Sequence, residues 1–417
     1  MRTVKRIETH QINKNHKLFK FCDRKCYESK NLYNSVNYVL RQRFTESEGY
    51  KKDNFNCNYY SLTTEFRNSK DAEPLASNFI EGILKVLSQD WKSFFSSIKN
   101  WKKNKSKYNG KPNLPGYAPT GSEGRKVAID RRINRRKDDT FKFAGEKVYF
   151  EPQTDKPLKQ ARIVPKPNGE NVEYYNLEII YEKEVPEITE DKERIAGIDI
   201  GLNNLATVVN NIGEKPFYIN GKPVKSMNQY FNKKKAKFME YIGDKGTSNR
   251  LQKLHKKRNN KIKTYFHKAS RHIVDWCNDN DIQVIVIGRS KDWKQKINIG
   301  KVNNQHFVSV PFKMLIDQIE YKANDEGINV KLTEESYTSK ASFLDNDKLP
   351  KYKKNSDNGY EFSGKRIERG LYKSKEGIKI NADVNGAYNI IKKVFPQAIN
   401  ADGINKDLLH PKKINLE

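Results

Sequence analysis

One aspartate occupies a position where an ordinary surface acid is not expected. Asp199 lies in the segment Gly197-Ile-Asp-Ile-Gly-Leu-Asn-Asn, within an otherwise apolar predicted strand. A carboxylate there is costly unless a partner offsets its charge. The glycine-containing turn that follows would let backbone and substrate approach closely. For an isolated aspartate, a salt bridge or a satisfied hydrogen bond is the competing structural interpretation.

A second carboxylate, Asp383, lies in the segment Asn381-Ala-Asp-Val-Asn-Gly-Ala-Tyr-Asn-Ile, at the start of a predicted helix. Two acids far apart in the chain would gain chemical meaning if the fold brought them together. As the N-cap of its helix, however, Asp383 would need no catalytic role.

The elements that must position these acids alternate between strand and helix in the second half of the chain. The run 282–288 is nearly all apolar, as in a strand buried on both sides. Hydrophobic spacing predicts the other elements of this half: strands over 195–209 and 328–332, and helices over 246–276, 311–325 and 382–394.

The first half reads differently. A Pro/Glu-rich stretch, 185–193, is typical of a linker between the two halves. Before it, the pattern predicts a strand at 1–10, helices over 18–44 and 75–101, a basic loop over 99–119, and short strands at 141–143, 147–150, 161–164 and 174–181.

Charge indicates the kind of partner. The 417 residues include 80 Lys+Arg against 51 Asp+Glu, a formal charge of +29, and polyphosphate is the usual counterpart of such an excess. A ribosome-associated protein, or a merely soluble basic surface, would also fit the charge. Neither a secretory signal nor an apolar run long enough for a membrane span is evident, so we expect a location in the cytoplasm, associated with nucleic acid. The four cysteines, without a C-x-x-C pair, are interpreted as buried free thiols.

Together, the segments around the two aspartates resemble the RuvC-type nuclease domain of TnpB proteins, which are encoded by bacterial and archaeal transposons. Type V CRISPR effectors and Fanzor proteins are similar. Residues 197–207 resemble the first RuvC motif and residues 382–390 the third. Three landmarks lie between them in the same order: Asn304-Gln-His-Phe, Ile319-Glu-Tyr-Lys and Tyr337-Thr-Ser.

The resemblance implies an α/β plus β-barrel fold class, with an RNase H-like (RuvC) nuclease domain preceded by a β-barrel wedge-type module that carries a helical recognition insert. The implied domains are a wedge-like barrel (1–15 and 115–187), a helical recognition domain (16–114), the nuclease domain (191–400) with a target-nucleic-acid-binding insert (340–380), and a tail (401–417).

The resemblance also implies partners and cofactors. Three acidic residues would hold two Mg²⁺ ions, which prefer carboxylate oxygens. A guide RNA would supply sequence specificity by pairing with target DNA, and the protein would read a short flanking motif.

The second acidic residue of the family is missing from its usual place. It normally ends the strand after the long helix, but here that strand ends Val286-Ile-Gly-Arg289, and an arginine cannot bind Mg²⁺. Either the nuclease is inactive or another carboxylate substitutes. The next strand ends Leu332-Thr-Glu-Glu-Ser, and neighbouring strands lie only about 4.8 Å apart. By match to relatives with a relocated glutamate we choose Glu335, with Glu334 as the alternative.

The insert departs from the family pattern as well. The family usually has a four-cysteine zinc ribbon there, but Ser342 occupies the first cysteine position, and residues 341–382 contain no cysteine or histidine, so we expect no zinc. We expect a metal-free core instead, built from Phe343, Leu344, Leu349, Tyr352, Tyr360, Phe362, Ile367 and Leu371.

Basic side chains form candidate nucleic-acid contacts in three segments, although a charge run is commonly just a solvated face. The predicted contacts are Arg131, Arg132, Arg135, Arg136, Lys256, Lys257, Arg258, Arg366 and Arg369.

The sequence therefore predicts an RNA-guided DNA endonuclease in which Asp199, Glu335 and Asp383 bind two Mg²⁺ ions. Two alternatives stay open. Arg289 would suit a nuclease-inactive, RNA-guided DNA-binding protein that acts as a repressor. A transposition accessory that binds DNA without a guide is the other.

Overall fold

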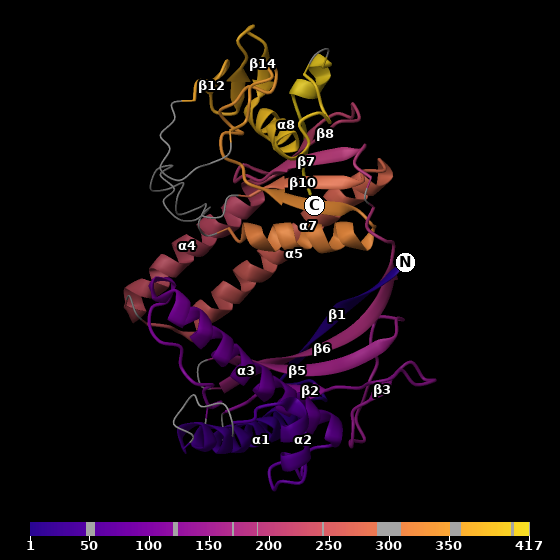
Figure 1. The fold of residues 1–417 in the computed structure, drawn as a ribbon, viewed down its shortest axis with the longest axis vertical. Coiled ribbons are helices and arrows are strands. Elements are labelled where there is room, and N and C mark those ends of the chain that lie inside the picture. The colour runs from indigo at the N-terminus through magenta and orange to yellow at the C-terminus, as the bar shows by residue number, and fades with distance from the viewer. Residues whose placement is uncertain are drawn as a thin grey trace. The chain divides into compact units, whose positions relative to one another are not determined.

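The chain folds into two compact units. The computed structural model describes residues 1–46, 55–119, 124–168, 171–189, 191–243, 246–289, 310–350, 360–401 and 404–416. One unit comprises Thr3–Glu184, and the other comprises Val185–Glu417 together with Met1 and Arg2 (Figure 1). The boundary coincides with the start of the predicted linker 185–193. The finer division into four domains stays a prediction.

The unit Thr3–Glu184 combines long helices with a four-stranded sheet of order β1-β6-β5-β2. Its elements are β1 (Arg2–Asn13), α1 (Phe19–Glu46), α2 (Tyr59–Phe66), α3 (Ser77–Lys103), a 3₁₀ turn η1 (Lys105–Lys107), β2 (Ala128–Asp130), β3 (Phe141–Lys142), β4 (Tyr149–Phe150), β5 (Leu158–Asn168) and β6 (Asn171–Val185). The predicted helices 18–44 and 75–101 are confirmed as α1 and α3. Helix α2 was not predicted, because it is short.

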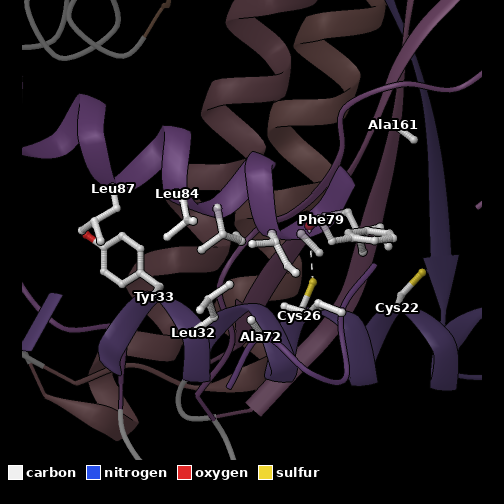
Figure 2. Packing of buried hydrophobic residues seen from close by; sticks show 14 of the residues in the cluster. Cys22, Cys26, Leu32, Tyr33, Ala72, Phe79, Leu84, Leu87 and Ala161 are labelled. Atoms are coloured by element: carbon white, nitrogen blue, oxygen red, sulfur yellow. Dashed lines mark hydrogen bonds between the residues drawn. The ribbon is translucent and has the colours of Figure 1, made fainter. Parts of the chain in front are cut away.

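Helices α1 and α3 share one hydrophobic core with the sheet (Figure 2). Trp91 is fully buried and donates from Nε1 to Asn37 Oδ1 at 3.0 Å. Cys22 and Cys26 are buried in the same core as free thiols. The Sγ of Cys26 lies 3.4 Å from the carbonyl of Ile163, so the thiol links α1 to β5.

The expected β-barrel is not formed by the described residues. The sheet is open, with β1 and β2 at its edges, and β3 and β4 form a separate two-stranded pair. The strands β2, β3 and β4 contain only two or three residues each, which is too little ladder to close a barrel. The sequence pattern showed the strands but could not show which edges pair.

The unit Val185–Glu417 is built on a six-stranded sheet of order β11-β10-β7-β8-β9-β15 and a small sheet β12-β13-β14. Its elements are β7 (Ile195–Asp199), β8 (Asn204–Asn210), β9 (Phe217–Asn220), α4 (Lys222–Ile242), α5 (Asn249–Asp279), β10 (Val284–Gly288), α7 (Phe312–Asp325), β11 (Asn329–Thr333), β12 (Lys365–Glu368), β13 (Leu371–Lys373), β14 (Lys379–Asn381), α8 (Ala382–Val394), a 3₁₀ turn η2 (Lys406–Leu409) and β15 (Lys412–Ile414).

The six-stranded sheet is covered on both faces, as predicted for the run 282–288. In β10, Ile285 and Ile287 belong to the core that contains α5 and α7. Val284 and Val286 belong to the core on the opposite face, where α8 packs (Figure 1). Every residue of β10 is buried, which explains the absence of an apolar–polar alternation in its sequence.

Three strands of this sheet end at one edge. Strand β10 pairs in parallel with β7, where Ile287 lies opposite Ile198, and in parallel with β11, where Gly288 lies opposite Thr333. The carboxyl ends of β7, β10 and β11 therefore meet, which is the usual place for functional side chains in such sheets. Helix α8 lies across the same strands.

Two local predictions need correction. Asp383 is not the N-cap of its helix, because Asn381 caps α8 by accepting from the backbone N–H groups of Asp383 and Val384. Helix α4 was not predicted at all, since its many lysines dilute the apolar stripe. Within the described part of the chain, the search for a helix with the length and apolar character of a membrane span finds none.

The close packing of β7 against α8 depends on Gly197. A Cβ added there would lie 2.7 Å from the carbonyl oxygen of Ala387 and 2.6 Å from Ile391 Cγ1. Because a helix carbonyl cannot move freely, we expect Gly197→Ala to lower the free energy of unfolding by about 1–3 kcal/mol, measured by denaturant titration. The control Gly116→Ala adds a methyl group that meets nothing within 4 Å. Equal stability of the two variants would contradict this packing.

Candidate active site

Asp199 ends β7 and faces the first turns of α8. A Cβ added at Gly386 would lie only 2.8 Å from Asp199 Oδ2, so the carboxylate is seated against a helix position that has no side chain. Gly386 stands three residues after Asp383, on the same side of the helix. Asp199 as a whole residue is partly exposed.

Asp383 lies in the first turn of α8 and is held by a side chain from β8. The amide nitrogen of Asn204 donates to Asp383 Oδ2 at 2.6 Å. The helix start favours negative charge at this position. Asn204 belongs to the first motif and is the first residue of β8, and its place in the sequence indicates no role. Only the fold shows that it contacts the acid of the third motif.

Glu335 follows the end of β11 and turns toward the end of the neighbouring strand. A Cβ added at Gly288, the last residue of β10, would lie 3.3 Å from Glu335 Oε2. The Glu335 carboxylate thus lies beside the position from which a side chain on β10 would project. Its backbone carbonyl accepts from Thr338 N and Oγ1, at 3.2 and 2.8 Å. The structure thus brings Asp199, Glu335 and Asp383 to one edge of the sheet.

Glu334, the alternative, is engaged elsewhere. Its carboxylate accepts from the ammonium of Lys393 and, at 3.1 Å, from the backbone N–H of Ser336. Burial opposes ionisation of Glu334, but these hydrogen bonds outweigh it and hold its pKa below the usual carboxyl range. A carboxylate committed to a lysine is a poor cation ligand, so the geometry favours Glu335.

The environment of the Asp199 carboxyl opposes its ionisation. Burial raises the pKa of Asp199 well above its usual range, and the negative charges of Asp383 and Glu335 raise it further. Arg366, from the exposed strand β12, acts in the opposite direction. Removal of water and repulsion by like charges are the conditions under which a carboxylate gains most from a bound cation.

The three carboxylates are of a type that binds divalent cations, although their side chains are not arranged as a complete set of metal ligands. Three carboxylates offer the hard oxygen ligands that Mg²⁺ prefers. Among the described residues, no group of three His, Cys, Asp or Glu side chains is arranged to hold a metal ion. The residue types thus suit Mg²⁺, while the binding of one or two ions by these three acids stays a prediction.

Arg289 lies just beyond β10, at the position expected for the family's glutamate. Its backbone N–H donates to the carbonyl of Thr333 at 2.7 Å, which continues the ladder between β10 and β11. Arg289 is partly exposed. The landmark Asn304-Gln-His-Phe lies outside the described residues.

The insert 340–380 is held by hydrogen bonds. The Asp347 carboxylate accepts from the backbone N–H groups of Ser342, at 2.7 Å, and Ser363, at 3.1 Å. Asn385 of α8 donates to the carbonyl of Ala341 and accepts from the backbone N–H of Phe343, both at 2.9 Å. These side chains join the first part of the insert to its small sheet and to α8.

The predicted core of the insert is only partly correct. Phe343 is fully buried and stacks on Tyr388 with ring centroids 4.5 Å apart. Tyr360 and Ile367 are exposed, whereas Tyr372, which was not predicted, is buried and donates to the carbonyl of Lys340. Period-two alternation is weak in such short strands, so the sequence did not show their buried face. Tyr352 lies outside the described residues.

The four arginines predicted near residues 131–136 have partners within their own unit. Arg131 and Arg132 both pair with Glu81, at 3.0 and 2.9 Å. Arg135 lies 3.5 Å from the carboxylate of Asp139, and Arg136 3.5 Å from that of Asp138. Their contact with nucleic acid stays a prediction, and each would have to share or leave an internal partner.

The basic residues of α5 divide into two kinds. Arg258 donates from Nε and Nη2 to Asn228 Oδ1 on α4, and its guanidinium lies over the ring of Phe231. It therefore ties α4 to α5. Lys257 is exposed and Lys256 is partly exposed. Arg366 and Arg369 are exposed at β12 and just after it.

Comparison with known families matches both halves of the candidate site. The family OrfB_IS605, described as a probable transposase, matches residues 178–294, and the family described as Cas12f1-like, TNB domain, matches residues 312–390. A TnpB-like protein, ORF457 of Acidianus two-tailed virus, is 24% identical over 89% of this chain and 83% of its own length. The chain is therefore similar to a TnpB-like protein over most of its length.

Two further relatives are CRISPR-associated. The endodeoxyribonuclease Cas12f2 of a Micrarchaeota archaeon is 26% identical over 59% of this chain, and the match spans 45% of Cas12f2. A solved complex of Cas12f1 with sgRNA and target DNA is similar in fold, with a TM-score of 0.56 and 15% identity over 90% of this chain and 82% of that one. The chain thus shares its overall fold with the Cas12f1 protein of that complex.

The raised pKa of Asp199 predicts a gain in stability when its charge is removed. Above the ordinary carboxyl pKa of about 4, keeping Asp199 ionised in the folded chain costs free energy, because its folded pKa is higher than its unfolded one. We expect Asp199→Asn to raise the melting temperature at neutral pH without added metal, and this gain to shrink as the pH falls toward 4. Differential scanning fluorimetry over a pH series measures both.

Added Mg²⁺ should offset the difference in melting temperature between Asp199→Asn and the wild type, because a cation that binds the folded state stabilises it. It should raise the melting temperature of the wild type more than that of Asp199→Asn. A variant that melts like the wild type at every pH, with and without Mg²⁺, would contradict the proximity of the three acids.

Proposed function

We propose that this protein is an RNA-guided DNA endonuclease whose cleavage site is formed by Asp199, Glu335 and Asp383. The observation that carries the proposal is the convergence of these three acids, from β7, the end of β11 and α8, at one sheet edge. The relatives support the guided part, because the solved Cas12f1 complex contains sgRNA and target DNA. The similarity to Cas12f2, an endodeoxyribonuclease, supports nuclease chemistry.

Each acid has a distinct task in this proposal. Asp199, beside Gly386 and between the other two, would be the shared cation ligand, and Asp383 and Glu335 would complete the set from either side. Bound divalent ions would lower the pKa of water and neutralise charge on the phosphate. Asn204 would keep Asp383 oriented through their 2.6 Å hydrogen bond.

The basic surfaces would hold the nucleic acids. With a formal charge of +29, the chain can neutralise many phosphates and release their counterions. Exposed cations without a structural task, such as Lys257, suit phosphate contacts better than Arg258, which ties α4 to α5. Arg366 reaches the electrostatic environment of Asp199, so β12 would lie near the cut strand.

Cleavage by the purified complex with its guide RNA tests the proposal. We expect cutting of a matched target in Mg²⁺, and a loss of roughly 10³-fold or more in rate for Asp199→Ala and Glu335→Gln, because each removes a cation ligand. At saturating Mg²⁺, Glu334→Gln should stay within several-fold of the wild type, since that carboxylate is bound by Lys393 and is not a cation ligand in this proposal. Gel-based cleavage assays at saturating guide measure these rates.

If no cleavage is seen, binding assays on the same samples distinguish between the alternatives. Tight, matched binding without cleavage would replace the proposal by the guided repressor suggested by Arg289. Binding to transposon ends without any RNA would favour the transposition accessory. Cleavage that survives Glu335→Gln but not Glu334→Gln would contradict the assignment of the relocated glutamate.

Two neighbouring cations of α5 separate phosphate contact from structural support. We expect Lys257→Ala to reduce the slope of log K against log salt by about 1 for guide RNA, with little change in melting temperature. Arg258→Ala should lower the melting temperature, because Asn228 and Phe231 lose their partner. Filter binding over a salt series and thermal unfolding check the pair, and the opposite pattern would contradict the division.

A further inference from the structure

Lys393 lies in the last turn of α8, the helix that carries Asp383, and its side chain is only 6% exposed. Its ammonium donates to the carboxylate of Glu334 and, at 2.7 Å, to the carbonyl oxygen of Ser336. These two residues flank Glu335 in the chain. A buried ammonium requires such partners, and here both lie in a single short turn.

We propose that Lys393 is the positioning residue for Glu335, so that α8 sets two of the three acids: Asp383 directly and Glu335 through this lysine. The inference rests on the proposed function, in which Glu335 binds a cation. In this role Lys393 supports cation binding without being a cation ligand itself.

The turn after β11 is closed from several sides. Besides Lys393, the backbone N–H of Ser336 donates to Glu334 at 3.1 Å, and Thr338 donates twice to the carbonyl of Glu335. The backbone of Glu335 is thereby held before and after its own Cα. Its side chain is left on the side of Gly288, at the end of β10.

Lys393 also decides between two adjacent carboxylates. Glu334 and Glu335 are chemically equivalent, and a turn free to rotate could present either one to a cation. Because Lys393 binds Glu334, that carboxylate is withdrawn from competition, and repulsion between it and the acid cluster is reduced. A ligand held in advance costs less ordering on binding, which raises cation affinity.

The helix α8 is a suitable anchor because it packs on the strands that end at the site. Its residues Ala387, Ile390 and Ile391 are buried against the sheet. A lysine near its C-terminal end also interacts favourably with the helix dipole. The helix α8 therefore helps to fix the position of Glu335 as well as that of Asp383.

Lys393→Met tests the proposal, because methionine keeps the length of the apolar stem and removes the ammonium. We expect Mn²⁺ affinity of the full chain, measured by isothermal titration calorimetry without nucleic acid, to fall about 10-fold or more. The Mg²⁺ concentration for half-maximal cleavage should rise correspondingly. Lys393→Arg, which can donate to both acceptors, should restore most of the affinity.

Lys392→Met is the matched control. It removes the same charge from the adjacent position of α8, where the ammonium donates to Asn346 at 3.0 Å rather than to the turn after β11. We expect its Mn²⁺ affinity to equal that of the wild type. Thermal unfolding confirms that each variant is folded, and should Lys393→Met not fold, Lys393→Gln gives the same comparison.

The outcomes separate the positioning role from the function itself. Unchanged Mn²⁺ affinity and Mg²⁺ dependence in a folded Lys393→Met or Lys393→Gln variant would overturn the role of Lys393. An equal loss in Lys392→Met would also overturn it, because the effect would be one of general charge. A wild type that binds no Mn²⁺ and cuts no matched target would instead reject the proposed function.

Discussion

Mutual repulsion among carboxylates at one edge of a sheet is the constraint on which the rest of this structure depends. Burial raises the pKa of Asp199 most, and the negative charges of Asp383 and Glu335 raise it further, so the fold opposes ionisation of this carboxyl. The scaffold tolerates this cost because the acids sit on rigid elements. Parallel strands bring two of them to the same edge, and α8 supplies the third, with Gly386 leaving room for Asp199.

The proposed place of the second acid, at the end of β11 instead of β10, is compatible with the same geometry. Adjacent parallel strands end side by side, so a glutamate two residues beyond β11 reaches the place where a side chain of β10 would lie. Gly288 makes this possible, because a side chain there would meet the carboxylate of Glu335. In this proposal Arg289 is not a metal ligand, and its backbone N–H donates to the carbonyl of Thr333 in the sheet.

The insert 340–380 is stabilised by hydrogen bonds and aromatic packing. Asp347 joins Ser342 to Ser363 through hydrogen bonds, and the stacked rings of Phe343 and Tyr388 pack beside them. Elsewhere, several cations that would suit nucleic acid are paired internally, as Arg131 and Arg132 are with Glu81. Charge alone therefore overstates the surface available for binding.

The sequence by itself determined the order of the motifs, the long helices, the doubly buried strand 282–288 and the identity of the candidate acids, because these depend on residue type and local periodicity. Only the tertiary structure showed that Lys393, distant in the chain, binds Glu334, a contact that favours the predicted Glu335 as the ligand. It likewise showed an open sheet in place of a barrel and a structural task for Arg258. Those outcomes rest on long-range pairing, which no local pattern encodes.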